Sequence, residues 1–196
     1  MSTKASSPSF ETEALREFGE VLKGRRTINL YLQTRVPEQL VTDAIEAATW
    51  APNHHVTEPW RFYRMGPASV ASTIERVREL VAKEKGQELA DFKAKSWAEK
   101  PGWLTVTCRR SEDPLLERED YAACSVAVQN FMLYLWKAGV GSKWTSGAIT
   151  RDPVFLEILG VDPEREFVVG MLWYGYPKIT PTQSRAAVED VTVDLP

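Results

Sequence analysis

Residues 119–150 read EDYAACSVAVQNFMLYLWKAGVGSKWTSGAIT, and we expect the rest of the chain to be organised around this stretch. Residues 121–136 are apolar or small at nearly every position, which predicts a helix buried on all sides. Gly139 is suited to end that helix, because glycine readily adopts the left-handed conformation found after many helices. Residues 140–144 then predict one short strand. The TSG sequence that follows adds two hydroxyls and a flexible backbone, at a place where helix-and-sheet folds commonly bind ligands.

Length and composition are those of one ordinary domain. The chain has 196 residues, of which 43 % are hydrophobic and 26 % are charged, and its net charge is -3. This balance gives no electrostatic attraction for nucleic acid or for an anionic membrane. We expect residues 1–10 to form a disordered, Ser-rich tail and residues 11–196 to form the domain. The sequence shows no signal-peptide core and no apolar run of about 20 residues, so a cytoplasmic location is expected.

Caps and breakers predict helices separated by a few strands. We expect helices at residues 10–24, 36–51, 67–85, 87–100 and 152–159, and strands at residues 60–65, 103–109 and 167–176. Residues 110–116 are expected to form a loop. Residues 188–193, VEDVTV, alternate and predict a strand with no neighbour in sequence to pair with. The fold class is therefore α+β, and the charged helices within residues 67–100 are the expected mobile cover over a site.

Missing motifs count against several functional classes. The sequence has no GxGxxG or GxxxxGK for nucleotide phosphates and no GxSxG nucleophile turn. Cys108 and Cys124 lack CxxC spacing and nearby histidines, so we expect two structural thiols in a reducing compartment. His54 and His55 are adjacent and should point apart, and no cysteine or glutamate at metal-ligand spacing accompanies them. Plain exposure in a loop and contact with a bound ligand both stay open for these histidines.

Arg25, Arg26 and Thr27 follow the first predicted helix and form a cluster of hydrogen-bond donors. Guanidinium groups bind phosphate oxygens in pairs, so the cluster could hold a phosphate. The same residues could instead be a solvated basic corner that offsets the helix dipole. The spacing alone leaves both interpretations open.

Five motifs, taken in order along the chain, resemble the flavin-dependent nitroreductase family, and in particular its small single-domain oxidoreductase branch. The motifs are RRTINLY at 25–31, ATWAPNHHVTEPWRF at 48–62, AGVGSKWTSGA at 138–148, GYPK at 175–178 and SRAAVEDV at 184–191. The resemblance covers most of the chain. It implies an α+β fold, with a mixed sheet flanked by helices, in an intertwined homodimer. The C-terminal strand would be exchanged between subunits, and two FMN molecules would lie at their interface.

The resemblance also implies an activity. A member of this family would be an oxidoreductase that transfers hydride from NAD(P)H through FMN to an electron-poor acceptor, such as a quinone or a nitroaromatic, by a ping-pong mechanism. No protein residue would need to act as a catalytic acid or base. The alternative is a flavin-binding carrier or redox sensor without turnover.

Site residues follow from the same resemblance. Those that match the phosphate-binding motifs are Arg25, Arg26, Thr27 and Arg185. Those that match further flavin contacts are Trp50, His54, Trp144, Thr145 and Ser146. Residues 134–139 match a stretch associated with the nicotinamide cofactor.

The chain departs from the family pattern at two positions. Where relatives have APSxxNxQPW, this chain has Val56 in place of the asparagine and Glu58 in place of the glutamine. Valine cannot donate a hydrogen bond, and an ionised glutamate only accepts, so neither residue reproduces the amide. We therefore expect flavin affinity, redox potential or substrate preference to differ from those of relatives.

Overall fold

The computed structural model describes residues 12–196, so the tail expected at residues 1–10 lies outside the described residues. Its helices are α1 (Glu13–Gly24), α2 (Glu38–Thr49), α3 (Pro67–Lys85), α4 (Gln87–Ala98), α5 (Pro114–Lys137) and α6 (Pro153–Leu159). Its strands are β1 (Trp60–Arg64), β2 (Gly102–Arg109), β3 (Gly141–Thr145) and β4 (Glu166–Gly175). Three short 3-10 turns are η1 (His54–Val56), η2 (Ala148–Arg151) and η3 (Val188–Asp190). Among residues 12–196, no helix is both long and apolar enough to cross a membrane.

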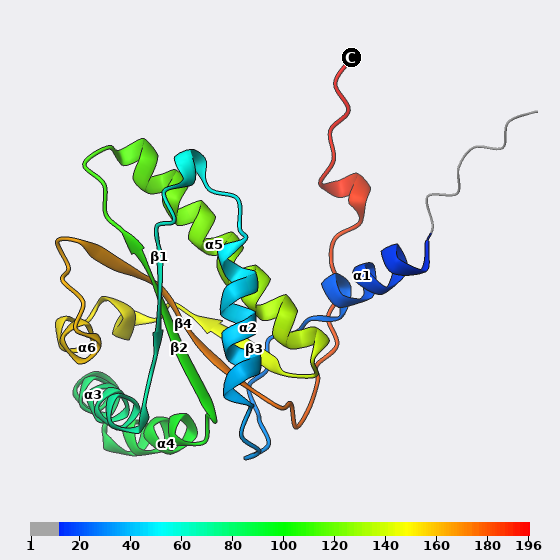
Figure 1. The fold of residues 1–196 in the computed structure, drawn as a ribbon. Coiled ribbons are helices and arrows are strands. Elements are labelled where there is room, and N and C mark those ends of the chain that lie inside the picture. The colour runs from blue at the N-terminus through cyan, green and yellow to red at the C-terminus, as the bar shows by residue number, and fades with distance from the viewer. Residues whose placement is uncertain (1–11) are drawn as a thin grey trace, which may run out of the picture.

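The four strands form one antiparallel sheet in the order β1-β2-β4-β3 (Figure 1). β2 and β4 are its central strands, with Trp103 opposite Trp173 and Leu104 opposite Leu172. Seven of the eight residues of β2 are buried. A strand covered on both faces is apolar along its whole length, which explains why its sequence is nearly continuous in apolar and small residues.

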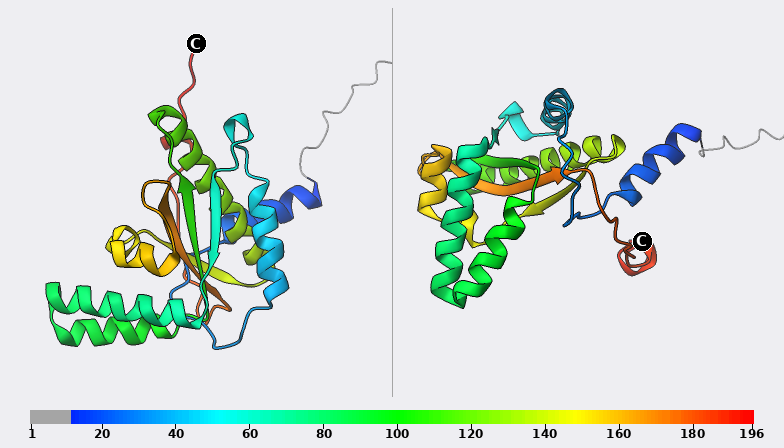
Figure 2. Two further views of the ribbon diagram at one scale, coloured as in Figure 1. Left: turned by 60° about the vertical axis from the view of Figure 1, so that its left-hand side comes forward. Right: turned by 90° about the horizontal axis from the view of Figure 1, so that it is seen from below.

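Helices cover both faces of this sheet (Figures 1 and 2). α5 and α2 pack on one face, where Leu104 and Val106 belong to the larger core cluster. The α3–α4 hairpin and α6 lie on the other face, where the rings of Trp97, Trp103 and Trp173 meet edge to face. Alternate side chains of a strand point to opposite faces, so β2 contributes to both clusters. The hairpin expected as a cover is thus packed on the sheet, and its mobility stays a prediction.

Capping residues set both ends of α6 where the sequence predicts them. The Asp152 side chain accepts a hydrogen bond from the Phe155 N–H at the start of α6, and the helix ends at Gly160, whose φ is 69°. α5 begins earlier than expected. Asp113 caps it by accepting a hydrogen bond from the Leu115 N–H at 2.9 Å, so the last residues of the predicted 110–116 loop belong to the helix.

The prediction that the central helix is buried on all sides is wrong for the single chain. Tyr121, Val126 and Tyr134 of α5 are 43 %, 39 % and 42 % exposed. α1 has no buried residue, and its large apolar side chains are exposed too; they are Leu15, Phe18 and Leu22. Apolar residues on two neighbouring helices therefore face away from the core, as they do at a subunit interface.

The C-terminal segment is not a strand in the single chain. Residues 188–190 form the turn η3, and the segment leaves the body of the fold without joining the sheet (Figures 1 and 2). Its apolar residues are exposed, including Val188, Val191 and Val193. A strand needs a partner for its backbone hydrogen bonds, so VEDVTV can become one only against another sheet edge.

Candidate functional site

Arginines from both ends of the chain lie together where α1 ends. Arg25 and Arg26 directly follow the helix, and Arg185 comes from the C-terminal segment. Burial lowers the pKa of Arg25, and the positive charges of Arg185 and Arg26 lower it further. Salt screens such repulsion beyond roughly 10 Å, so Arg26 and Arg185 lie within about that range of Arg25. The structure thus brings together the first and last of the five motifs.

No carboxylate in the described part of the chain neutralises this cluster. Among residues 12–196, none of the ion pairs includes Arg25, Arg26 or Arg185. The Arg26 and Arg185 side chains donate hydrogen bonds to nearby backbone carbonyls, those of Arg25 and Ser184, each at 2.9 Å. Three clustered guanidinium groups without a counter-ion are suited to bind a multiply charged anion such as a phosphate.

Thr27 joins the arginine cluster to β3. It forms an isolated parallel bridge with Ser142, whose carbonyl accepts a hydrogen bond from the Ile28 N–H at 3.0 Å. Ser146 follows Ser142 by four residues in the direction of β3, and four residues of extended strand span roughly 13 Å. An elongated ligand with a phosphate at the cluster could therefore extend along β3 to its far end.

The end of β3 presents one fixed aromatic wall and one exposed hydroxyl. The Trp144 indole donates a hydrogen bond to the Val169 carbonyl at 3.3 Å. The indole packs close to β4 because Gly170 has no side chain, and a Cβ there would be 1.9 Å from the indole nitrogen. Thr145 is half-buried and Ser146 is exposed. Ser146 is thus the residue of this group that is open to a ligand.

The loop between α2 and β1 has an unusual backbone. His55, Val56 and Glu58 have φ values of 58°, 52° and 43°, in the left-handed region that non-glycine residues rarely adopt. The Thr57 hydroxyl holds the loop by donating a hydrogen bond to the buried Asp120 carboxylate at 2.5 Å. Strain of this kind costs about 1–3 kcal/mol per residue and tends to occur at functional sites. Both departures from the family pattern, Val56 and Glu58, lie in these strained positions.

The two histidines of this loop stack, so the prediction that they point apart is wrong. Their ring centroids are 3.9 Å apart with an angle of 18° between the planes. The positive φ of His55 accounts for this, because it turns the chain back at that residue. His54 Nδ1 lies 2.9 Å from a carboxylate oxygen of Glu119 on α5. Trp50, at the start of the loop, is 81 % exposed. Residues 12–196 contain no group of three side chains arranged to bind a metal ion.

The arginine cluster and the His54 loop lie near opposite ends of α5 (Figure 1). A Cβ on Gly24, beside the arginine cluster, would lie 3.2 Å from Trp136. His54 instead contacts Glu119. An α-helix rises about 1.5 Å per residue, so these two contact points on α5 are roughly 25 Å apart. One chain therefore gathers Arg25, Arg26, Thr27 and Arg185 near the start of β3, but it leaves His54 far from this arginine cluster.

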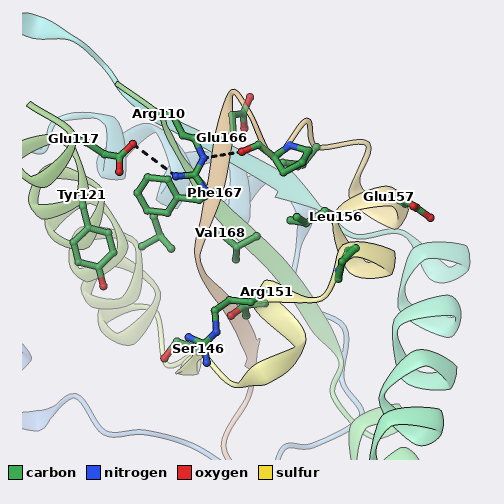
Figure 3. A pocket seen from close by; sticks show the side chains of 15 residues that line it. Arg110, Glu117, Tyr121, Ser146, Arg151, Leu156, Glu157, Glu166, Phe167 and Val168 are labelled. Carbon is green, nitrogen blue, oxygen red and sulfur yellow. Dashed lines mark hydrogen bonds and ion pairs between the residues drawn. The ribbon is translucent and has the colours of Figure 1, made fainter. Parts of the chain in front are cut away.

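A cavity of about 820 Å³ opens beside Ser146 (Figure 3). The rings of Tyr121 and Phe167 stack in its wall, with centroids 6.2 Å apart. Arg110 lies over Phe167, donates a hydrogen bond to the Pro163 carbonyl at 2.6 Å and is 3.9 Å from Glu117. This volume is within the range of small-molecule binding sites.

Apart from Ser146, the sequence did not reveal the residues of this cavity. Tyr121, Arg151 and Phe167 come from three separate elements, so no local pattern joins them. Glu119 and Asp120, which hold the strained loop, did carry a signal. Two carboxylates directly before a long apolar run must find partners if they are not to be buried alone.

The cysteines are not candidates for catalysis. Cys108 and Cys124 are both buried in the core and free, as expected of structural thiols. A hydrogen bond with Cys108, together with burial, raises the pKa of Cys124. Since the thiolate is the nucleophilic form, Cys124 is kept in its unreactive state.

Comparison with known proteins gives one consistent result. Residues 22–176 match the model of the nitroreductase family. The chain is 32 % identical over 177 residues to the Bacillus subtilis (strain 168) protein named "Putative NAD(P)H nitroreductase YfhC", covering 87 % of this chain and 90 % of that protein.

Solved structures agree with this match. A nitroreductase-like family protein from Bacillus cereus superposes with a TM-score of 0.79 at 26 % identity, over 97 % of this chain and 99 % of that one. A nitroreductase from Bacteroides fragilis NCTC 9343, solved with bound FMN, superposes with a TM-score of 0.73 at 22 % identity, over 91 % and 99 % of the two chains.

Proposed function

This chain belongs to the nitroreductase family, and from that membership we propose that it is an FMN-dependent NAD(P)H oxidoreductase. It would act by a ping-pong mechanism on an electron-poor acceptor such as a quinone or a nitroaromatic. Bound FMN would supply the hydride transfer, and the protein would supply binding, orientation and charge. We assign no catalytic acid or base to the chain. We place the reaction in the cytoplasm, where buried thiols such as Cys124 stay reduced.

The arginine cluster is the observation that carries this proposal. Arg25, Arg26 and Arg185 gather three positive charges that no described carboxylate neutralises, and the phosphate of FMN would neutralise them. A hydrogen bond to a charged group contributes about 1.5–3 kcal/mol. Thr27 keeps the cluster beside β3, so the ring of the cofactor would lie toward Thr145 and Ser146.

A second copy of the chain would complete the site. The arginine cluster and the His54 loop are too far apart along α5 to hold one flavin within a single chain. In a two-fold dimer with its α5 helices packed antiparallel, the His54 loop of one copy would meet the arginine cluster of the other. The exposed apolar residues of α1, together with Val126 and Tyr134 of α5, would be buried at this interface, and residues 188–193 would cross to pair with the partner.

A flavin-binding carrier or redox sensor without turnover is the second candidate. The loop that would contact the ring has Val56 and Glu58 where relatives have amides, and both have positive φ. A carboxylate near the ring would oppose any gain of negative charge there. This loop is therefore the feature that favours the second candidate.

The absorbance spectrum of the purified protein tests the cofactor, and two further measurements test the activity. We expect the two visible bands of oxidised flavin, bleaching of those bands by anaerobic NADH or NADPH, and steady turnover with menadione. Colourless protein after reconstitution with FMN would contradict flavin binding. A flavin that bleaches, but with menadione turnover near background, would select the carrier or sensor.

A further inference from the structure

We propose that Arg151 anchors the carboxylate of an aromatic electron acceptor in the 820 Å³ cavity beside Ser146. The inference rests on the proposed function, because it assigns a substrate class to the cavity next to the expected flavin contacts. Arg151 would be a specificity-determining residue, and it belongs to none of the five family motifs.

The cavity has the walls of a site for a planar ring. Tyr121 and Phe167 lie close to parallel, with 24° between their planes, and Leu156 and Val168 add aliphatic surface from α6 and β4 (Figure 3). Aromatic and aliphatic side chains bind an arene by burying its faces. The shape of the cavity therefore selects an aromatic ring, and the charges in its wall decide which substituent that ring carries.

All but one of the charges turned toward this cavity already have partners. Arg110 is engaged by Glu117 and by the Pro163 carbonyl. The Glu166 carboxylate accepts hydrogen bonds from Arg61, Tyr63 and Thr107 at 3.1, 3.0 and 2.5 Å. The side chain of Glu157 is exposed and points away from the other labelled residues (Figure 3).

Arg151 is the remaining charge. Among the described residues, its side chain makes no ion pair and donates no hydrogen bond, and it reaches toward Ser146 (Figure 3). The carboxylate nearest to it in sequence, Asp152, is already paired with Arg76 through two contacts of 2.9 Å. An arginine beside an apolar cavity, with its donors unused, is suited to bind a carboxylate through two hydrogen bonds.

The turn that carries Arg151 is held in place before any ligand arrives. The Thr150 hydroxyl donates a hydrogen bond to the Gly147 carbonyl at 2.8 Å, and the Asp152 N–H donates one to the Ile149 carbonyl at 3.0 Å. A guanidinium on a rigid turn loses less conformational entropy on binding than one on a flexible loop. Arg151 is thus pre-positioned next to Ser146.

A second cavity strengthens the positive potential around this turn. It has a volume of about 590 Å³ and is lined by Lys85, Lys93, Lys143 and Arg151, with Glu84 as its one carboxylate besides the neutralised Asp152. Cations that line neighbouring hollows attract anions toward both. Arg151 lies between the two cavities and belongs to the wall of each.

The test compares two acceptors that differ in one charge, 4-nitrobenzoate and the neutral 4-nitrobenzamide. With either acceptor, one NAD(P)H and one proton reduce the nitro group to a nitroso group, releasing NAD(P)+ and water. The flavin-loaded wild type should have the lower KM for the acid. In Arg151→Gln, the KM for the acid should rise about ten- to hundredfold, as expected for losing a hydrogen-bonded charge, while the KM for the amide stays within about twofold. Arg151→Lys should restore part of the preference.

Binding without turnover gives a second readout. Benzoate, titrated into the oxidised holoprotein without NAD(P)H, should perturb the flavin absorbance, and its Kd should weaken in Arg151→Gln by the same factor as the KM. Arg165→Gln is the matched control, because Arg165 is an exposed arginine outside the cavity wall. This control should behave as wild type in both assays.

Three results would overturn the inference. The first is an equal increase in the KM for the acid and for the amide in Arg151→Gln, and the second is an unchanged benzoate Kd in that variant. The third is an increase in the KM for NADPH with no change in the KM for either acceptor. The last result would mean that Arg151 serves the hydride donor. Failure of the proposed function looks different, because wild-type protein would then bind no FMN or would fail to reduce menadione. Flavin content and melting temperature, measured for each variant, separate misfolding from lost recognition.

Discussion

At the scale of single residues, one missing side chain shapes the wall of the candidate flavin site. Gly170 leaves room for the Trp144 indole, which is fixed by its hydrogen bond to the Val169 carbonyl. We expect Gly170→Ala to destabilise the fold by about 1–3 kcal/mol, because its Cβ would overlap a ring that cannot move freely. Urea unfolding measures this. Gly147→Ala is the control, since its Cβ would meet open space, and equal stability losses in the two variants would contradict the argument.

The arginine cluster gives a second prediction at this scale. Arg25→Ala and Arg185→Ala should each weaken FMN binding by about ten- to hundredfold, because each removes charge-assisted hydrogen bonds to the phosphate. Gel filtration followed by the absorbance spectrum measures the flavin retained, and titration of the apoprotein gives the Kd. Arg165→Ala should retain flavin as the wild type does. Unchanged retention in both cluster variants would remove the phosphate site.

Single residues also show what the sequence could and could not reveal. The convergence of Arg25 and Arg185 followed from a resemblance to a family, and the lowered pKa of Arg25 supports it. The stacked histidines did not follow, because a positive φ at His55 has no signature when the residue is not glycine. Arg151 was missed because its isolation depends on how its neighbours pair in three dimensions.

At the scale of elements, an ion pair connects α3 to the start of α6. The Arg76 guanidinium lowers the pKa of Asp152, and the capping hydrogen bond from the Phe155 N–H lowers it further. The folded state therefore favours the ionised carboxylate. This contribution is fully present above the ordinary aspartate pKa of about 3.9, and it is lost as the pH falls through the lower pKa of the folded protein.

The lowered pKa of Asp152 gives a prediction for the stability of the protein in acid. Between pH 6 and pH 3, the urea midpoint of the wild type should fall more steeply than that of Asp152→Asn, which should already be less stable at pH 6. Asp194→Asn, in the exposed C-terminal segment, should keep the wild-type slope. Parallel curves for Asp152→Asn and the wild type would show that the pair contributes nothing.

Elements with strong end signals were predicted well, and those that depend on a partner were not. α6 has Asp152 before it and Gly160 after it, and both ends lie where they were expected. α5 was expected to be buried on all sides because its sequence is apolar throughout. Apolar composition does not distinguish a core from a subunit interface, and one side of α5 is exposed. Residues 188–193 alternate as a strand does, but the single chain offers them no edge to pair with.

At the scale of the whole molecule, the two halves of the candidate site lie near opposite ends of one long helix. Two-fold symmetry is the simplest way to bring such halves together, because it places each end of α5 beside the other end of its partner. Each dimer would then contain two sites, each made from the arginine cluster of one chain and the His54 loop of the other.

Mixing two defective variants tests this arrangement. The first variant carries Arg25→Ala and Arg185→Ala, and the second carries Trp50→Glu and His54→Glu. We expect each homodimer alone to bind little FMN, because one half of both its sites is damaged.

After joint refolding of the two variants at equal concentrations, half of the dimers should be mixed, and each mixed dimer should have one intact site and one site damaged twice. Flavin content should therefore recover to about one quarter of the wild-type value, as expected for random pairing of symmetric subunits. If both halves of a site came from one chain, every site would stay damaged, and mixing would restore nothing.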